Sequence, residues 1–579
     1  MSARILPSHA PRILTAALLS AGLLASPLAF SQQAILEGER FHPEESPGGM
    51  VATSHFLASE VARDVLAAGG NAVDAAVVAG FALAVTQPRS GNIGGGGFML
   101  ISDEESGEVI AIDYRETAPA AAFETMFQDQ DGEAVTERSR FTHLAAGVPG
   151  TVAGLALALE QYGTLSLAEA LAPAIRLAEE GFVVPPRFVK GLNDTRARFE
   201  AWDASMTTFF KEDGSAYQVG EVFRQPDLAA TLRRIADQGA REFYEGETAR
   251  LVVAEMERHG GLITAEDLAG YQPVIREPSH GTYRGHDIYA MSPPSSGGAH
   301  IVQMLNILEE YPIGELGFGS AESMHLMAEA MKRAYADRSE FLGDTDFIDV
   351  PLAGITSKEY AAELRAQIGD QATPSAEVAP GNPFDYESNE TTHFSIVDDG
   401  GLAVSNTYTI NFSYGSGIVV DGAGFLLNNE MDDFSAKPGV PNAYGLIGGE
   451  ANKVEPGKRM LSSMTPTIVK RDGKNFLITG SPGGSRIITT TLQVLMNVID
   501  HDMNIQSAVS APRMHHQWLP DEIRIEAGFS PDTLSLLEQR GHTVSQQPAM
   551  GAAQSILIDD GMFYGGADPR RSTSSAIGL

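Results

Sequence analysis

The distribution of apolar and polar positions predicts a helical first part of the chain. Residues 55–86 contain two apolar-periodic runs separated by Gly69-Gly70, and Asn71 is a suitable N-cap for the second run. This pattern predicts two helices in tandem, the second almost wholly buried. The region from 148 to 340 also has mostly helical periodicity, interrupted by glycine and proline.

Short apolar segments between turn residues predict antiparallel hairpins in the rest of the chain. The paired segments are 98–102 with 109–114, 394–397 with 402–411, and 467–470 with 475–479, and 418–427 extends the second pair. A helix-like run follows at 485–500. Helices first and hairpins later predict an α+β fold with antiparallel sheets between helical layers.

The N-terminal residues have the pattern of an export signal. Arg4 and Arg12 precede the apolar run 13–30, and Ala29-Phe30-Ser31 provides small residues at a spacing that suits signal peptidase. We therefore expect residues 1–31 to be a cleaved signal peptide and the protein to be periplasmic or secreted. The alternative is a retained membrane anchor, although the apolar run is short for a span.

Composition excludes several classes of function. The 579 residues include no cysteine, which rules out thiol nucleophiles and thiolate metal sites. The 75 acidic residues against 40 basic ones give a formal charge of −35, which repels nucleic acids and anionic membranes. We expect neither to be a partner.

Common catalytic motifs are missing. The chain has no G-x-S-x-G, H-E-x-x-H or G-x-G-x-x-G pattern. His515-His516 is a weak metal signal, because adjacent side chains point apart and no carboxylate lies at ligand spacing on a helix. We expect no metal and no cofactor.

A pair of threonines opens the sheet-rich part of the chain. Thr391-Thr392 follows a turn-rich segment, 371–390, that shows no periodicity. A threonine hydroxyl is a weak nucleophile, and peptide cleavage before it frees an α-amine that can act as its base. Taken alone, two threonines are more commonly ordinary strand residues.

The segment that these threonines begin, TTHFSIVDDGGLAVSNTYTINFSYG (391–415), resembles the start of the small subunit of γ-glutamyltranspeptidases. The resemblance extends from about Val51 to the C-terminus. Its other motifs, in chain order, are SGNIGGGGFM (90–99), DYRETAP (113–119), LLNNEMDDFS (426–435), LSSMTPTI (461–468) and GSPGGSRI (480–487).

The resemblance implies the N-terminal-nucleophile hydrolase fold, a four-layer αββα sandwich made from one self-cleaved precursor. The cut is expected between Glu390 and Thr391. It would give a large subunit, 32–390, and a small subunit, 391–579, which stay associated as a heterodimer and together form one αββα unit.

The resemblance also implies roles for individual residues. Thr391 would be the nucleophile, Thr409 would hydrogen-bond near it and assist processing, and the amides of Gly483 and Gly484 would form the oxyanion hole. An α-amine suits the role of base, since its ordinary pKa is about 7.7–8.0.

The far end of a γ-glutamyl group carries both a carboxylate and an ammonium. By resemblance, the carboxylate is held by Arg115, Ser462 and Ser463, the ammonium by Asn411, Glu430 and Asp433, and the lid tip is Tyr444 within 438–449. From the residues alone, Arg115-Glu116 reads as a surface pair and Asp432-Asp433 as a solvated turn.

The expected function is transfer of the γ-glutamyl group of glutathione or related compounds, through a Thr391 ester, to water or to amino acids and peptides. Two alternatives stay open. One is a cephalosporin (glutaryl) acylase of the same family, whose substrates lack the α-ammonium. The other is an unprocessed periplasmic binding protein.

Overall fold

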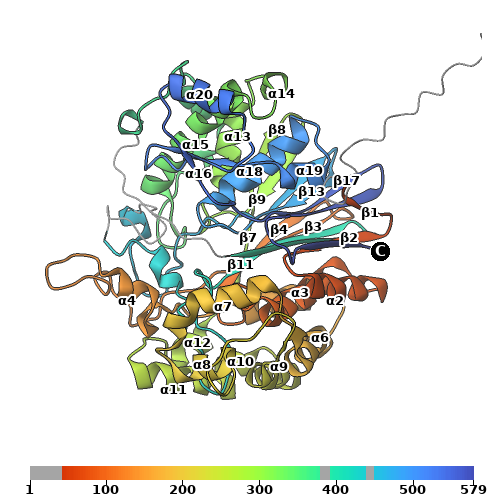
Figure 1. The fold of residues 1–579 in the computed structure, drawn as a ribbon, viewed down its shortest axis with the longest axis vertical. Coiled ribbons are helices and arrows are strands. Elements are labelled where there is room, and N and C mark those ends of the chain that lie inside the picture. The colour runs from red at the N-terminus through yellow and green to blue at the C-terminus, as the bar shows by residue number, and fades with distance from the viewer. Residues whose placement is uncertain (1–41, 379–390, 438–448) are drawn as a thin grey trace, which may run out of the picture.

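The computed structural model describes residues 42–378, 391–437 and 449–579. Two sheets lie face to face in the middle of the molecule, with helices above and below them (Figure 1). This arrangement is the four-layer αββα sandwich expected from the sequence.

Each central sheet has seven strands. Sheet I has the order β1 (Glu44–Ser46), β18 (Met562–Ala567), β17 (Gln554–Asp559), β13 (Lys474–Thr479), β12 (Thr467–Arg471), β9 (His286–Ala290) and β8 (Ser279–Tyr283). Sheet II has the order β19 (Ser575–Gly578), β2 (Gly49–Thr53), β10 (Thr392–Asp398), β11 (Leu402–Thr409), β3 (Gly96–Asp103), β4 (Val109–Tyr114) and β7 (Val274–Arg276). All neighbours within each sheet for which a register is defined are antiparallel.

Helices from the first half of the chain form the lower layer in Figure 1. They are α2 (Phe56–Ala67), α3 (Ala72–Thr86), α5 (Thr151–Tyr162), α6 (Leu167–Glu180), α7 (Pro186–Phe199), α8 (Asp203–Phe209), α9 (Pro226–Gln238), α10 (Arg241–Glu245), α11 (Glu247–His259) and α12 (Ala265–Gly270). The fully buried α3 contacts β10 and β11 directly, so the helical layer supports the strands at the centre of sheet II.

The upper layer covers sheet I (Figure 1). It contains α13 (Gly297–Leu308), α14 (Ile313–Leu316), α15 (Ala321–Phe341), α16 (Leu352–Ile355), α17 (Lys358–Arg365), α18 (Arg486–Ile499), α19 (Ile505–Ser510) and α20 (Pro531–Gln539). Smaller elements complete the chain: α4 (Thr136–Arg140), η1 (His143–Ala145), η2 (Ser375–Glu377), η3 (Glu430–Asp433), η4 (Glu450–Asn452), the β5–β6 pair (Phe182–Val183, Val222–Phe223) and a small sheet of β14 (Met514–His515), β15 (Ile523–Ile525) and β16 (Val544–Gln546).

Three apolar cores hold the layers together. One lies between the lower helices and sheet II, and a second lies between the upper helices and sheet I. The third joins the facing sides of the two sheets, where Phe98 and Leu100 of sheet II pack with Ile468 and Ile478 of sheet I. Burial of this apolar area, at about 25 cal/mol per Å², is the main force that keeps the sheets stacked.

The parts of the chain on either side of position 391 interleave in both sheets. Sheet I contains β1, β8 and β9 from before this position and four strands from after it. Sheet II contains β2, β3, β4 and β7 from before it and β10, β11 and β19 from after it. Neither part forms a complete central sheet of its own.

Most elements expected from periodicity are confirmed. Asn71 caps α3 with its side chain, and the Asp74 carboxylate accepts a hydrogen bond from the Asn71 backbone N–H. The three predicted hairpins are β3–β4, β10–β11 and β12–β13, and α18 occupies the predicted helical run.

The predicted strand at 418–427 is wrong. The segment forms a turn held by a single bridge between Val419 and Leu426. Gly422 and Gly424 have φ of +74° and +73°, and a Cβ on Gly424 would lie 2.4 Å from the Leu228 amide nitrogen of α9. Close packing on α9 therefore overrides the strand preference of the apolar residues.

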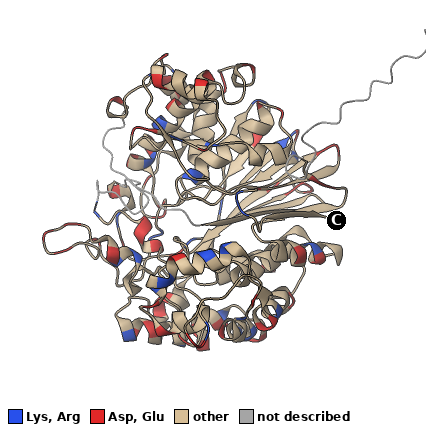
Figure 2. Cartoon of the chain, viewed as in Figure 1, with Lys and Arg blue, Asp and Glu red and all other residues tan. Residues whose placement is uncertain are grey.

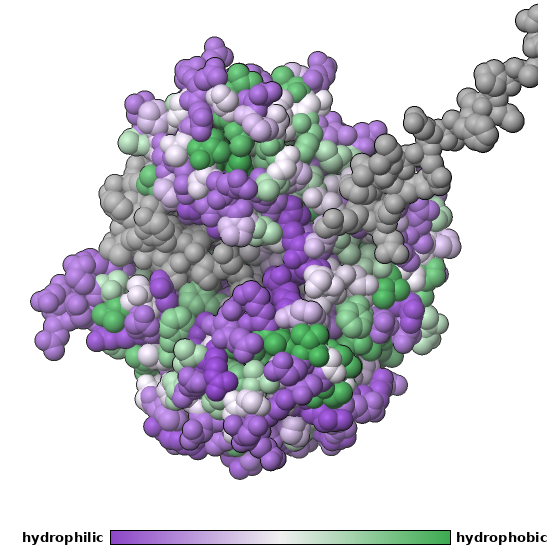
Figure 3. All heavy atoms as spheres, in the orientation of Figure 1, coloured by the Kyte–Doolittle hydropathy of each residue, from purple (hydrophilic) through white to green (hydrophobic). Residues whose placement is uncertain are grey.

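Charged side chains lie mainly on the outer helices and loops, while the strands of the two sheets carry few (Figure 2). The face shown in Figure 3 is mostly hydrophilic, with separate apolar patches. Within the described ranges, no helix combines the length and the apolar character that crossing a membrane requires.

Candidate functional site

Thr391 lies at the entrance to the central hairpin of sheet II. It is 5% exposed and directly precedes β10. The antiparallel register pairs Thr392 with Tyr408, so the next position places Thr409 across from Thr391. The carbonyl oxygen of Thr391 accepts a hydrogen bond from Arg571 Nη2 at 3.2 Å.

The residues that follow Thr391 are fixed by neutral groups. Thr392 Oγ1 lies 2.6 Å from Ser54 Oγ and accepts a hydrogen bond from Gln87 at 3.1 Å. The His393 ring lies 2.9 Å from Thr407 Oγ1, and burial lowers the pKa of His393 to about 3. This imidazole therefore stays uncharged at neutral pH, and the contacts recorded among the described residues hold Thr392 and His393 through uncharged groups.

The glycine-rich run 94–97 lets β11 approach closely. A Cβ on Gly95 would lie 2.0 Å from the Thr409 carbonyl oxygen, which is far inside van der Waals contact. The Asn92 side chain donates to that carbonyl at 2.9 Å and accepts from the Gly95 amide at 2.9 Å. Asn92 and Gly95 together fix the end of the strand that carries Thr409.

A short hydrogen-bonded path leads from Thr409 toward η3. The Asn411 amide donates to Thr409 Oγ1 at 2.8 Å, and the Asn411 side chain donates to the Asn429 carbonyl at 2.9 Å. Asn411 has φ of +70°, a conformation that asparagine tolerates better than most residues. Asn429 directly precedes Glu430, so Asn411 connects the two predicted halves of the site.

Arg115 is fully buried among three carboxylates. Its Nη1 lies 2.9 Å from Glu430 Oε2 and 3.5 Å from Glu116 Oε2, and its Nη2 lies 2.5 Å from Asp433 Oδ2. Glu116 and Glu430 side chains are fully buried, whereas that of Asp433 is 17% exposed. The cluster therefore opens to solvent on the Asp433 side.

The carboxylates outnumber the guanidinium in this cluster. Burial raises the pKa of Glu116 to about 8, although Arg115 opposes the shift, and burial also raises the pKa of Glu430 and Asp433 above their usual range. Burial alone would lower the pKa of Arg115, but Glu430, Asp433 and Glu116 outweigh it and keep Arg115 charged. A cluster of this kind favours a ligand that brings a further positive charge.

The segment 460–463 closes the other side of Arg115. The guanidinium faces the carbonyl oxygens of Met460 and Leu461 at 3.3 and 3.5 Å. Ser462 is anchored by its backbone, which donates to the Pro294 carbonyl at 2.9 Å. Ser463 Oγ accepts a hydrogen bond from Arg338 Nη2 at 3.0 Å.

Gly483 and Gly484 precede Ser485, the N-cap of α18, and have φ of +138° and +61°. Gly480, three residues earlier, packs on the His393 ring, since a Cβ there would lie 2.5 Å from His393 Cε1. The loop that carries the two glycines thus passes beside the start of β10. The described contacts do not include one between these glycines and Thr391.

Two site predictions fall outside the described residues. These are Glu390, before the expected cut, and Tyr444, the expected lid tip. Two readings made from the residues alone are wrong: Arg115-Glu116 is a buried pair rather than a surface pair, and Asp432 is 3% exposed rather than solvated.

Several supporting residues were missed by the sequence analysis. Asn92 and Asn428 are buried amides that bridge the glycine-rich loop, and Asn428 donates to the carbonyls of Gly94 and Gly147 at 2.8 Å. Arg338 and Arg571 contact the predicted site residues from distant parts of the chain. Asn92 and Asn428 lie within the family motifs SGNIGGGGFM and LLNNEMDDFS, so their positions were a usable signal. The sequence around Arg338 and Arg571 gives no indication of their contacts.

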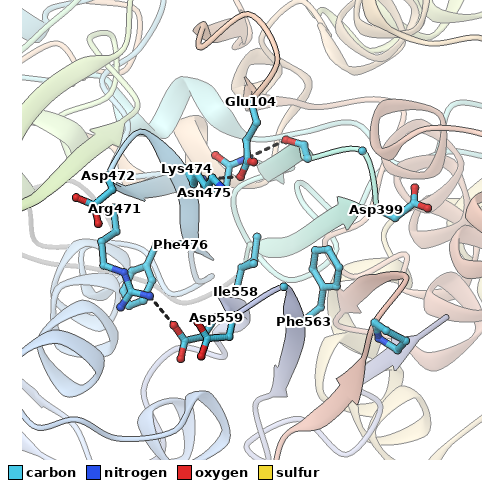
Figure 4. A pocket seen from close by; sticks show the side chains of 15 residues that line it. Glu104, Asp399, Arg471, Asp472, Lys474, Asn475, Phe476, Ile558, Asp559 and Phe563 are labelled. Carbon is cyan, nitrogen blue, oxygen red and sulfur yellow. Dashed lines mark hydrogen bonds and ion pairs between the residues drawn. The ribbon is translucent and has the colours of Figure 1, made fainter.

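A cavity of about 730 Å³ lies elsewhere, at the far end of the central hairpin. Figure 4 shows its polar lining, which includes Asp399, Asp472 and Asp559 from the turns and ends of three hairpins. Thr391 and Asp399 lie at opposite ends of β10, which has seven residues and so spans about 23 Å. None of the predicted site residues within the described ranges lines this cavity.

Comparison with known proteins agrees with the fold and with the motifs. The family model for gamma-glutamyltranspeptidase matches residues 58–578. The chain is 52% identical to the glutathione hydrolase proenzyme of Escherichia coli (strain K12), over 98% of each chain. It is also 39% identical to the acylase ACY 1 proenzyme of Pseudomonas sp. (strain V22), over 91% of this chain and 92% of that one.

Solved structures give the same result. The cephalosporin acylase of Bacillus halodurans superposes with a TM-score of 0.82 at 30% identity, covering 95% of this chain and 99% of that chain. A gamma-glutamyltranspeptidase chain of Helicobacter pylori superposes with a TM-score of 0.56 at 48% identity, covering 57% of this chain and 94% of that chain. From the family match and the full-length relatives, we conclude that this chain is an enzyme of the gamma-glutamyltranspeptidase family.

Proposed function

We propose that this protein is a self-processing glutathione hydrolase and γ-glutamyltransferase. The single observation that carries the proposal is the joint placement of Thr391 at the start of β10 and of Arg115 among Glu430 and Asp433, connected through Asn411. Family membership and the 52% identical glutathione hydrolase proenzyme support the same activity.

The first proposed step is cleavage of the Glu390–Thr391 peptide bond, which leaves subunits 32–390 and 391–579. The interleaving of both parts in both sheets supports a pair that stays together after cleavage. Cleavage frees the α-amine of Thr391. Since this amine has an ordinary pKa of about 7.7–8.0, a useful neutral fraction is available to take the hydroxyl proton near pH 7.

In the proposed reaction, Thr391 Oγ1 attacks the γ-carbonyl carbon of the donor, and the amides of Gly483 and Gly484 stabilise the oxyanion. Collapse of the intermediate expels the amine product, which takes a proton, and leaves a γ-glutamyl ester on Thr391. Water or an acceptor amino acid or peptide then attacks the ester and restores the hydroxyl. Water gives glutamate, and an amine gives a new γ-glutamyl compound.

Substrate recognition is proposed to rest on the ionisable groups around Arg115. The α-carboxylate of the donor would face the guanidinium together with Ser462 and Ser463, and the α-ammonium would face Asn411, Glu430 and Asp433. The raised pKa values of Glu116, Glu430 and Asp433 support this arrangement, because an arriving ammonium favours the ionised form of these carboxyl groups. Tyr444 is proposed as the lid over the bound group.

Residues 1–31 are proposed as a signal peptide, which would make the mature enzyme periplasmic or secreted. The basic, apolar and small-residue pattern of this segment supports the proposal.

A glutaryl (cephalosporin) acylase is the second candidate, supported by the 39% identical acylase proenzyme and the structurally similar cephalosporin acylase. The buried carboxylates disfavour it, since a glutaryl chain brings no ammonium to offset them. An unprocessed binding protein is the remaining alternative.

The test begins with intact masses and N-terminal sequencing of the purified protein. A chain that starts at Thr391 supports the proposed nucleophile, whereas a folded but uncut chain would refute it and favour a binding role. Rates with γ-glutamyl and glutaryl anilides then separate the two enzymes. Faster turnover of the glutaryl compound would overturn the glutathione assignment.

A further inference from the structure

Two histidines and a glutamate meet in the lower part of the molecule, outside the proposed catalytic site. Glu255 and His259 lie one turn apart at the C-terminal end of α11, which Figure 1 shows in the lower layer, and His143 is the first residue of η1. Each side chain offers one ligand atom, and these atoms all lie within 4.8 Å of one another. No short motif reveals the group, because His143 is 112 residues from Glu255.

The distances suit a small divalent ion. Glu255 Oε1 lies 2.9 Å from His143 Nε2 and 3.5 Å from His259 Nε2. A tetrahedral ion with bonds of about 2.0–2.1 Å requires ligand atoms about 3.3 Å apart. Small shifts of the side chains would therefore give three suitable bonds.

The surroundings allow His259 to shift and hold His143 in place. The two imidazoles stack with centroids 4.7 Å apart, and the Trp202 ring packs edge-on against both. His143 is buried, whereas the His259 side chain is 33% exposed. His259 can tilt so that both Nε2 lone pairs converge, and its exposed side offers a route for the ion and a fourth position for water.

Glu255 is prepared as a single-oxygen ligand. Arg258 Nη1 lies 3.4 Å from Glu255 Oε2, so the other oxygen, Oε1, is the one that faces the rings. A neighbour that orients a ligating carboxylate in this way is typical of metal sites.

A second group of the same composition makes a useful contrast. His325, Glu329 and His542 are also close enough to hold an ion. However, Glu329 already faces Arg333 at 2.6 Å and Lys332 at 3.3 Å, and both nitrogens of His325 are hydrogen-bonded. A dication there would have to displace two buried cations, so this group is a structural network.

We propose that His143, Glu255 and His259 bind one divalent transition-metal ion of the Zn²⁺ type. Two imidazoles and one carboxylate are the ligand set that zinc, cobalt and nickel accept, and an open fourth position is left for water. The ion would tie α11 to η1, and η1 packs against η3, which carries Glu430 and Asp433. The site is additional to the proposed chemistry at Thr391.

The test uses the purified full protein after chelation and desalting, and it measures metal binding rather than activity. Calorimetric titration with Zn²⁺ should give one equivalent per molecule, and Co²⁺ should give the visible absorption of a tetrahedral site. His259→Ala, at a partly exposed position that tolerates truncation, should weaken Zn²⁺ binding by more than about 100-fold, since even changes behind the ligands cost about 10–100-fold.

Two matched variants control for other histidines. His280 lies 3.0 Å from Asp287 at the surface and belongs to neither group, so His280→Ala should bind Zn²⁺ as the wild type does. His542→Ala should also bind one equivalent of Zn²⁺ per molecule. The proposal is overturned if the wild type binds no Zn²⁺, if His259→Ala binds it unchanged, or if His280→Ala or His542→Ala loses it instead.

Discussion

The two ends of the proposed site are built from opposite kinds of groups. The groups around Thr391 are hydroxyls, amides and the uncharged imidazole of His393. Among the described residues, the charged group in contact with the Thr391 backbone is the Arg571 guanidinium. Around Arg115 the chain buries three carboxylates and one guanidinium. The proposed reacting end is therefore built mainly from uncharged groups, and the proposed recognition end is built from ionisable ones.

This difference separates chemistry from recognition. Within the described ranges no contact places a carboxylate at Thr391, and the Arg571 guanidinium beside the Thr391 carbonyl favours the uncharged form of the proposed amine base. Buried charges at the other end are poorly screened, so they discriminate strongly between ligands of different charge. Substitutions at the first end should therefore abolish reaction, and those at the second should change which ligand binds.

The largest expected effect is that of Thr391→Ala. Without the hydroxyl, the precursor should stay uncut, and turnover of γ-glutamyl anilides should fall by about 10⁴-fold or more. Intact mass and initial rates measure both effects. Thr392→Ser, which keeps the hydroxyl near Ser54, should be cleaved normally, and a cleaved, active Thr391→Ala variant would show that another residue is the nucleophile.

Gly95→Ala should come next, because the added Cβ meets the Thr409 carbonyl. Overpacking of this kind costs about 1–3 kcal/mol or more, and the displaced end of β11 should slow self-cleavage. Thermal unfolding and the cleaved fraction after expression are the measurements. Gly270→Ala, whose Cβ would meet nothing within 4 Å, is the control and should behave as wild type; equal behaviour of both variants would contradict the close approach.

Asp433→Asn tests the charged end alone. A hydrogen bond to a charged group is worth about 1.5–3 kcal/mol, so KM for γ-glutamyl substrates should rise about 10- to 150-fold. KM for glutaryl substrates should rise less, since they carry no ammonium. The exposed Asp399→Asn variant is the control, and a parallel rise for both substrate classes would argue against an ammonium site at Asp433.

Glu116→Gln comes last, because its expected effect falls on the pH dependence of stability and not on turnover. Burial raises the pKa of Glu116 to about 8, whereas in the unfolded chain it is about 4.3. Between these values the folded state binds more protons, so stability falls as pH rises, by at most about 1.4 kcal/mol per pH unit for this group.

Glu116→Gln should flatten that slope between about pH 4.5 and 8, as measured by denaturant unfolding at several pH values. The exposed Glu105→Gln variant should leave the slope as it is in the wild type. An unchanged slope in Glu116→Gln would mean that another group carries the proton.

The hairpin that follows Thr391 was largely predictable from the sequence, and the cluster around Arg115 was not. Alternation and the Asp398–Gly401 turn predict β10–β11, because hairpin formation depends on neighbouring residues. The partners of Arg115 at Glu430 and Asp433 are more than 300 residues away, so no local pattern reveals its burial. Only the family resemblance assigned these residues to one site.

The failed strand at 418–427 has a similar cause. Its apolar residues are typical of sheet, yet its turn is decided by contact with α9, about 190 residues earlier, as at Thr231 and Ala423. Local sequence preference predicts an element correctly when tertiary contacts do not oppose it. The prediction fails when packing against a distant part of the chain determines the backbone conformation.

The interleaved sheets change the kinetic order of folding if the chain is cut before Thr391. The uncut chain folds in a unimolecular reaction, since β2, β10 and β19 belong to one molecule. After the cut, the same strand pairs must form between two separate chains, so complete unfolding becomes a dissociation and apparent stability depends on protein concentration. The precursor is therefore the form in which this sandwich assembles efficiently, and the mature pair preserves an arrangement that dilute separate chains would recover slowly.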